Sequence, residues 1–275
     1  AVNEVSRFYS GRGGLVAAIG SALDAAGLHG AALKPEDLAP VDEFHIRGRA
    51  ATMEIVAALG VTADSKVLDL GSGLGGPART LAELTGCAVT GVDLTPEFCD
   101  VATALSGWTG MAERTSFRVG DATATGLPDA TFDAALTVHV AMNIPDKPAL
   151  YAEAFRVLRP GGRFAVYDVL QGEGGDPHYP VPWANDASTS FLATSEEMRD
   201  MLTAAGFAIV SEADSSEASL AWFQQLRERV EREGPPPVTF ASFLGDAFGR
   251  MAANQVANLA ERRIRTVMLV CARPR

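Results

Sequence analysis

The chain has 275 residues, a formal net charge of −11 and a hydrophobic content of 47%. This length allows one large domain or a core domain with an added cap, and the hydrophobic content is enough for a sizeable core. The acidic balance argues against a nucleic-acid partner, because phosphate binding requires clustered Lys and Arg. Three scattered cysteines without CxxC spacing favour a reducing, cytoplasmic setting. No apolar run is long enough to cross a bilayer, so no membrane partner is expected.

The N-terminal part, residues 1–62, is predicted to be a helical adapter or lid. Helices are expected over 15–27 and 48–60, and Gly60 is the expected C-cap of the second helix. The segment between these helices contains Pro35 and Pro40, which predicts a loop.

From Lys66 onward, short apolar runs alternate with helical patterns, which predicts an α/β fold. Strands are expected over 66–70, 87–94, 115–121, 131–140 and 163–170, and helices over 77–86, 95–108 and 147–158. The turn Pro160-Gly161-Gly162 is expected to stop the last of these helices. Alternating strands and helices with short connections indicate a doubly wound, Rossmann-like parallel sheet with helices on both faces.

After Leu170 the alternation stops, and a loop rich in Gly, Pro and aromatic residues follows. Later elements are a helix capped by Ser195, a strand over 207–214, helices over 215–233 and 243–263, and a final strand over 264–273. We therefore expect residues 63–275 to form the core, with cap insertions at about 171–194 and 216–262.

A glycine-rich turn follows the first predicted strand directly. Gly71, Gly73 and Gly76 satisfy the spacing GxGxxG at the start of a predicted helix. Such a turn lets a ligand approach the backbone at a helix N-terminus. Proteins that bind NAD, FAD and other nucleotides share this spacing, so the glycines predict a nucleotide-like ligand without identifying it.

Three aspartates near this turn narrow the ligand class. Asp69 precedes Gly71 by two residues, where it would repel a diphosphate and favour a cationic ligand. Asp93 ends the second strand about 20 residues after Gly71, the spacing of an acid that binds ribose; the alternative is an acid at the start of the helix capped by Thr95. Asp121 follows the third strand, where it either accepts from an adenine amino group or only forms a turn.

The segments VLDLGSGLGG, GVDL, GDA and LRPGG together resemble the class I S-adenosylmethionine-dependent methyltransferases. The segment DEFHIRGRAAT is similar to their small-molecule branch, which includes sarcosine/dimethylglycine N-methyltransferases and natural-product methyltransferases. The resemblance implies a seven-stranded sheet with an antiparallel last strand, a helical and loop cap over the active site, and S-adenosyl-L-methionine as cofactor.

The resemblance also implies roles for individual residues. Gly71, Ser72 and Gly73 would face the methionyl and ribose parts of the cofactor, and Asp93 would bind the ribose hydroxyls. The remaining cofactor contacts implied in this way are Asp69, Leu94, Asp121 and Ala122, Thr137 to His139 at the sulfonium, and Tyr9, His45 and Arg49 from the N-terminal segment. Arg49 would pair with the methionyl carboxylate; the alternative is a solvated arginine at a helix start.

The sequence departs from the family at one catalytic position. Many relatives carry His-x-Pro-Asp after the fourth strand, whereas this chain has Asn143 at the position of that histidine. The role of general base that the histidine implies therefore cannot be assigned to Asn143. His139, four residues earlier, is a base, a hydrogen-bond donor only, or a structural histidine. The candidate catalytic residues are His139, Asn143 and His45. The acceptor pocket is expected to include His139, Met142, Asn143, Tyr179, Trp183, Phe191, Phe240, Phe243 and Phe248.

The predicted activity is methyl transfer to an N, O or C atom of a small-molecule acceptor by in-line displacement, aided by positioning and desolvation. No metal is expected, because His29, His45, His139 and His178 show no ligand spacing. One alternative is an NAD-dependent oxidoreductase using the same glycines, against which Asp69 and the LRPGG turn argue. A second alternative is a catalytically silent homologue that binds the cofactor.

Overall fold

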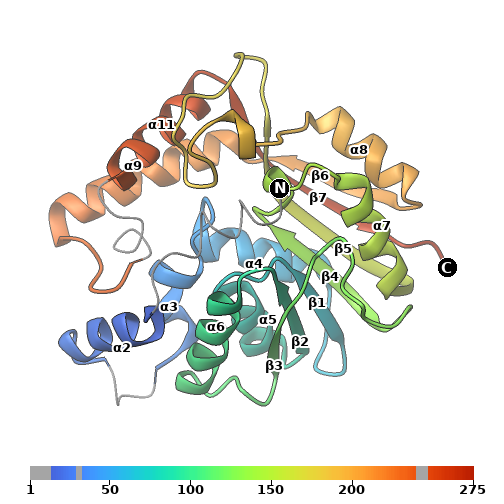
Figure 1. Ribbon diagram of the computed structural model, residues 1–275, viewed down its shortest axis with the longest axis horizontal. Helices are drawn as coiled ribbons and strands as arrows, with labels where there is room; N and C mark the ends of the chain where they lie inside the picture. Colours follow the sequence, from blue (N-terminus) through green and yellow to red (C-terminus); the bar gives the residue numbers. More distant parts are fainter. Residues whose placement is uncertain (1–13, 29–32, 240–246) are drawn as a thin grey trace.

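The computed structural model describes residues 14–28, 33–239 and 247–275, which contain a seven-stranded sheet with helices on both faces (Figure 1). The strand order is β3-β2-β1-β4-β5-β7-β6. The strands are β1 (Lys66–Leu70), β2 (Ala88–Asp93), β3 (Thr115–Val119), β4 (Phe132–Val138), β5 (Leu158–Gln171), β6 (Ala208–Asp214) and β7 (Ile264–Ala272). The first five strands pair in parallel, and β7 is antiparallel to both of its neighbours. The predicted Rossmann-like sheet with an antiparallel last strand is therefore confirmed.

Separate apolar clusters hold the helices to the sheet. On one face, α4 (Gly48–Leu59) and α5 (Gly76–Thr85) pack against the strands. On the other face, α7 (Lys147–Val157) and α8 (Ser195–Ala204) do the same. Because both faces are covered, the central strands are buried on both sides, which explains their continuous apolar character in the sequence.

A third apolar cluster joins the N-terminal helices to the sheet edge near β3. It contains side chains of α2 (Leu15–Ala25), α3 (Pro35–Asp42) and α6 (Pro96–Trp108). Leu74 of the glycine-rich turn belongs to the same cluster, so the N-terminal helices lie directly beside that turn.

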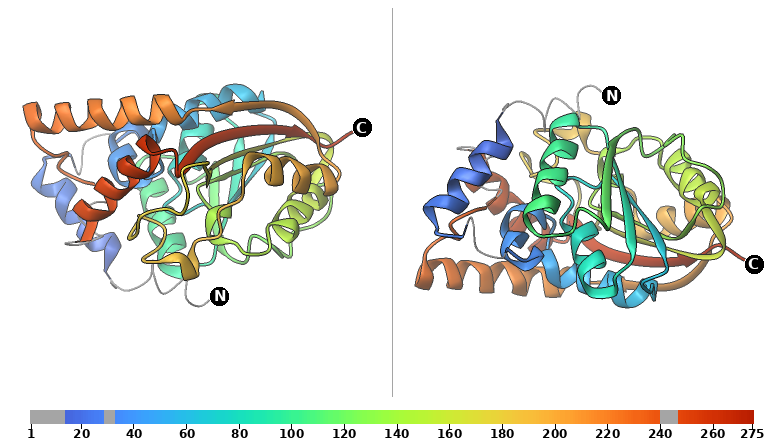
Figure 2. Two further views of the ribbon diagram at one scale, coloured as in Figure 1. Left: turned by 90° about the horizontal axis from the view of Figure 1, so that it is seen from above. Right: turned by 90° about the horizontal axis from the view of Figure 1, so that it is seen from below.

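Within the described residues, the cap consists of the loop after β5 and two helices between β6 and β7. These helices, α9 (Ser216–Glu233) and α11 (Phe248–Ala260), lie beside each other at the opposite end of the molecule from α7 and α8 (Figures 1 and 2). Trp183 of the loop packs with Leu259 of α11 and Met142 of a short 3-10 helix, η1 (Ala141–Asn143). None of the helices within the described residues is both long and apolar enough to span a bilayer.

The structure differs from the predicted loop around Pro35 and Pro40, which forms helix α3. Pro35 occupies the first helical turn, where its missing N–H costs nothing. The Asp37 side chain accepts a hydrogen bond from the Lys34 N–H at 2.8 Å, which satisfies the helix start. Burial of Leu38 on the helix then outweighs the unfavourable interior Pro40.

Some helix and strand boundaries also differ from the predicted ones. The predicted turn Pro160-Gly161-Gly162 lies within β5, at an irregularity in its pairing with β4. The N-cap of α8 is Thr194 rather than Ser195, because Thr194 forms a capping box with Glu197. The first part of the predicted helix over 243–263 lies outside the described residues, and the described part is α11.

Candidate active site

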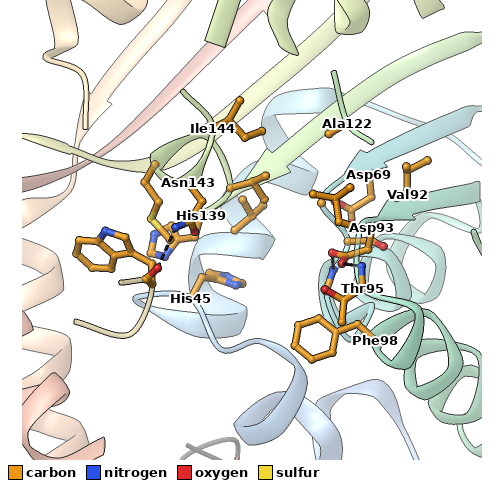
Figure 3. Close-up of a pocket in the computed structure, with 18 of the residues that line it drawn as sticks. His45, Asp69, Val92, Asp93, Thr95, Phe98, Ala122, His139, Asn143 and Ile144 are labelled. Carbon is orange, nitrogen blue, oxygen red and sulfur yellow. Dashed lines mark hydrogen bonds between the residues drawn. The ribbon is translucent and has the colours of Figure 1, made fainter. Parts of the chain in front are cut away.

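A cavity of about 310 Å³ lies at the carboxyl ends of β1, β2 and β4 (Figure 3). The strand order reverses between β1 and β4, and ligands of open α/β sheets bind at such a switch point. The described residues of the lining include five aspartates and neither Lys nor Arg. The five are Asp42, Asp69, Asp93, Asp121 and Asp146. This lining favours a cationic ligand over a diphosphate.

The glycines of the turn serve different purposes. Gly71 has φ +79°, and a Cβ atom there would lie 2.4 Å from Cγ2 of Val140, so packing requires glycine. A Cβ on Gly76 would lie 2.3 Å from the carbonyl oxygen of Asp42. Gly73 has φ +51°, and a Cβ there would meet nothing within 4 Å. Protein packing therefore explains Gly71 and Gly76, whereas the left-handed backbone favours glycine at Gly73 and open space lies beside it.

Asp93 lies at the end of β2 and accepts two backbone hydrogen bonds. Its Oδ2 accepts from the Gly73 N–H and its Oδ1 accepts from the Thr95 N–H, each at 2.9 Å (Figure 3). Burial raises the pKa of this carboxyl, and the two N–H groups oppose that shift. Each oxygen keeps a second acceptor direction, so Asp93 can fix the helix start and still accept from ribose hydroxyls.

Asp69 is buried beside the glycine turn. Among the described residues its Oδ2 has no hydrogen-bond partner. Burial raises the pKa of Asp69 to about 8, and the neighbouring Asp93 and Glu43 carboxyls add to the shift. A bound cation would favour the ionised carboxylate. The Oγ of Ser72, on the same turn, is also buried without a partner in the described chain.

The end of the cavity near β3 has the residues predicted to surround adenine. Asp121 lines it, and its Oδ1 accepts from the N–H and the hydroxyl of Thr123 at 2.8 and 2.7 Å. Asp121 thus forms the predicted turn and also faces the cavity. Leu94 and Ala122 line the same end, together with Phe98, which the sequence did not single out (Figure 3).

His139 follows β4 in the left-handed backbone region, with φ +53°. Its N–H donates to the Tyr167 carbonyl at 2.8 Å, which fixes this unusual conformation. Burial, and then the neighbouring His45, lower the pKa of His139 well below its usual range. The imidazole is therefore neutral at physiological pH, and its Nε2 has no partner within the described residues.

His45 lies at the same end of the cavity, with its ring centroid 5.8 Å from that of His139 (Figure 3). Its Nε2 lies 2.9 Å from the Gly48 carbonyl oxygen, so this nitrogen carries the proton. Burial lowers the pKa of His45 to about 4. The structure thus brings together two of the three candidate catalytic residues, His45 and His139, as neutral imidazoles.

Asn143 lines the cavity, but its amide nitrogen is engaged by the cap loop. Nδ2 donates to the carbonyl oxygens of Trp183 at 2.9 Å and Thr189 at 3.0 Å. The N–H of Phe191 also donates to the Met142 carbonyl at 2.7 Å. These bonds hold the loop against the turn after β4, so the geometry gives Asn143 a structural task beside its predicted catalytic one.

Other predicted site residues lie elsewhere. Arg49 is not among the residues that line this cavity; it donates to Thr80 at 2.7 Å and to Glu83 at 2.6 Å on α5, and its contact with the cofactor stays a prediction. Thr137 is fully buried within β4. Tyr179, Phe191 and Phe248 are absent from the described lining, whereas Trp183 and Met142 belong to it. Tyr9, His29, Phe240 and Phe243 lie outside the described residues.

Several lining residues were missed by sequence reasoning. Phe44 directly precedes His45 in the segment that suggested the small-molecule branch, so its position was a usable signal. Gln255 lies on α11, far along the chain from the motifs, and nothing in its local pattern indicates a cavity. Among the described residues no group of three or more His, Cys, Asp or Glu side chains is placed to hold a metal ion.

Part of the chain is similar to known methyltransferases. A family model described as "Methyltransferase domain" matches residues 68–166. A sterol 24-C-methyltransferase of Eremothecium gossypii is 31% identical over 175 residues, which are 61% of this chain and 47% of that protein. Methyltransferase GfsG of Streptomyces halstedii is 34% identical over 134 residues, 49% of this chain and 48% of that protein. The chain thus spans about half the length of these curated relatives.

A solved structure shows the same fold. Geranyl diphosphate C-methyltransferase of Streptomyces coelicolor A3(2), in complex with S-adenosyl-L-homocysteine, matches with a TM-score of 0.72 and 18% identity, covering 99% of this chain and 97% of that one. Residues 68–166 thus match a methyltransferase domain, the relatives that share this region are methyltransferases, and the solved structure has the same fold as this chain.

Proposed function

We propose that the protein transfers the methyl group of S-adenosyl-L-methionine to a small-molecule acceptor. One observation carries this proposal above the others. Asp93 is held between the N–H groups of Gly73 and Thr95, in a cavity whose described lining has five aspartates and no Lys or Arg. This arrangement suits a ribose attached to a positively charged sulfur.

The residues present fit that cofactor. Asp93 would accept from the ribose hydroxyls, and Asp121, Leu94 and Phe98 would surround the adenine. The unpartnered carboxylate oxygen of Asp69 would lie near the cationic methionyl part. The cofactor, when bound, supplies a methyl group on a positively charged sulfur.

The chain itself would orient the acceptor and exclude water. Positioning of this kind can supply roughly 7–11 kcal/mol of the barrier in favourable cases. Where the acceptor atom carries a proton, the neutral His139 imidazole can accept that proton at its free Nε2. Trp183 and Met142 would shield the reacting atoms from solvent.

The partner of this enzyme is proposed to be a small molecule, not a nucleic acid or a membrane. The similar sterol methyltransferase and geranyl diphosphate methyltransferase are named for small-molecule acceptors. We also propose a cytoplasmic location, which suits the three buried cysteines Cys87, Cys99 and Cys271, each present as a free thiol.

The oxidoreductase alternative receives no support from the relatives described above. NAD would also place its diphosphate beside Asp69 and Asp93, and the described lining has no Lys or Arg to offset the repulsion. The alternative of a silent binder makes a different prediction, because it binds cofactor without turnover.

Calorimetric titration with S-adenosylhomocysteine and with NAD⁺ separates these functions. We expect micromolar binding of S-adenosylhomocysteine and none of NAD⁺; tight NAD⁺ binding alone would contradict the proposal. A second assay follows transfer of radiolabelled methyl from the cofactor into a metabolite extract. Labelled product supports the enzyme, whereas cofactor binding without product in any extract favours the silent binder.

A further inference from the structure

The end of the cavity beyond the glycine turn has its own lining. His45 and His139 form part of its wall, and Met142, Pro182 and Trp183 add apolar surface from η1 and the cap loop. Figure 3 places the two histidines and Asn143 away from Asp93, Thr95 and Phe98. A methyl acceptor would occupy this end, because the nucleoside groups belong at the other.

Gln255 of α11 also lines the cavity. The residue is 7% exposed, and neither amide atom hydrogen-bonds to any other residue of the described chain. Leu259 lies one helical turn later on the same face, and it packs in the cluster that contains Trp183 and Met142. Gln255 therefore belongs to the acceptor end.

The other two amide side chains on this part of α11 form hydrogen bonds, whereas that of Gln255 forms none to a described residue. Asn254 donates to the Pro180 carbonyl at 2.9 Å, and Asn258 donates to the His178 carbonyl at 3.0 Å. These two amides bind α11 to the cap loop, so the helix is fixed. Gln255 is the amide of these three that forms no hydrogen bond within the described chain, and its side chain faces the cavity, where a ligand can pair with it.

The buried side chains at this end of the cavity offer an acceptor no free charge. Asp69, Asp93 and Asp121 surround the glycine turn and the nucleoside end. Asp42 is paired with Arg79 at 2.7 Å, and Asp146 accepts from the Ala149 N–H at the start of α7. Both histidines are neutral because burial lowers their pKa values. Asp146 is exposed to solvent, so a charged acceptor would be desolvated here without an opposite charge from the buried part of the described lining.

We propose that Gln255 recognises the methyl acceptor by a hydrogen bond, and that the acceptor is a neutral molecule with one hydroxyl or carbonyl oxygen on an otherwise apolar frame. This inference rests on the proposed function, because it assigns the nucleoside end to the cofactor. The neutral acceptor proposed for this chain differs from the substrate named for the similar geranyl diphosphate methyltransferase, which carries an anionic diphosphate.

Four matched probes test the proposal on protein saturated with S-adenosylhomocysteine. They are 2-naphthol, naphthalene, 2-naphthoate and 2-naphthylmethylammonium, which share one frame and differ in charge and in the oxygen. Calorimetry at pH 7 is expected to show 2-naphthol binding about tenfold more tightly than either ion. Gln255→Leu is expected to weaken 2-naphthol about fivefold to twentyfold and to leave naphthalene unchanged within about twofold. Gln255→Asn tests whether a shorter amide restores part of the affinity.

The control is Gln224→Leu, because Gln224 is exposed on α9 and bonds only to Glu228 among the described residues. The proposal is overturned by equal weakening of 2-naphthol and naphthalene in Gln255→Leu, or by an ionic probe that binds as tightly as 2-naphthol. Absence of saturable 2-naphthol binding up to about 1 mM also counts against it. Failure of S-adenosylhomocysteine to bind in the first step would instead contradict the proposed function.

Discussion

Asp93 is oriented by the backbone before any ligand arrives. Its two oxygens accept from the N–H groups of Gly73 and Thr95, which also fixes the glycine turn against the start of α6. A carboxylate held in this way loses little conformational entropy when ribose hydroxyls donate to it. Hydrogen bonds to a charged acceptor are worth about 1.5–3 kcal/mol each.

Asp93→Ala is therefore expected to weaken S-adenosylhomocysteine binding by about 10- to 100-fold or more. Calorimetry measures the affinity, and the melting temperature shows whether the variant is folded. Asp100→Asn is the matched control, because Asp100 is exposed on α6. Unchanged affinity in a folded Asp93→Ala variant would mean that the ribose is bound elsewhere.

Asp69 makes cofactor binding depend on pH. Burial raises its pKa to about 8, so the free protein holds a proton there at neutral pH. A cationic ligand favours the ionised form, so binding releases this proton. The affinity for S-adenosylmethionine is expected to rise with pH, by at most about tenfold per pH unit for one proton, and to level off above about pH 8. Calorimetry in two buffers of different ionisation enthalpy counts the released protons.

The same carboxyl affects stability without ligand. The native state binds a proton that the unfolded chain loses near pH 4, so the contribution of Asp69 to stability falls as pH rises from about 4 to about 8. Asp69→Asn removes the titrating group and is expected to flatten both pH profiles. A wild-type affinity that is constant between pH 6 and 8 would show that no cation binds near Asp69.

Single residues differ in how well the sequence predicts them. The positions of Asp69, Asp93 and Asp121 follow from strand ends, which local apolar runs reveal. Arg49 could not be placed in this way, because its partners Thr80 and Glu83 lie on another helix. The same holds for Gln255, whose approach to the cavity depends on how the cap packs.

Among the elements, buried strands were the most predictable and α3 the least. The central strands β1, β2 and β4 are short apolar runs between turn residues, whereas α3 contains two prolines and is stabilised by contacts distant in sequence. One of these contacts is the buried ion pair of Arg79 and Asp42, which joins α5 to the end of α3 with an N–O distance of 2.7 Å. Arg79 also donates to the Ala102 carbonyl of α6 at 2.9 Å, so one side chain connects three helices.

Arg79→Leu is expected to lower the free energy of unfolding by about 3–5 kcal/mol at pH 7.5, because it leaves the buried Asp42 carboxylate without its partner. The loss should be smaller at pH 5. Burial already raises the pKa of Asp42 to about 6, and removal of Arg79 raises it further, so the carboxyl is neutral there. Urea unfolding at the two pH values measures both effects.

The matched control is Arg227→Leu, because Arg227 pairs with Glu231 on the exposed face of α9 at 3.8 Å. Its cost should be within about 1 kcal/mol. An Arg79→Leu variant as stable as the wild type at pH 7.5 would show that the pair does not hold α3 to the core.

At the scale of the whole molecule, the sheet topology determines where the site lies. The strand order reverses between β1 and β4, and the glycine turn, Asp93 and His139 all follow strands near this point. The motif resemblance was sufficient to predict this architecture. The cap could not be predicted in detail, because its loop is held by Asn143 of η1 and by Asn254 and Asn258 of α11, which lie far apart in the chain.

The most direct measurement is a crystal structure of the protein with S-adenosylhomocysteine bound. We expect both ribose hydroxyls to lie within about 2.5–3.0 Å of the Asp93 carboxylate oxygens. We also expect the adenine to lie beside Asp121 and Phe98 and the sulfur to be directed toward His139. A nucleoside bound away from the glycine turn, with Asp93 still engaged only by Gly73 and Thr95, would contradict this expectation.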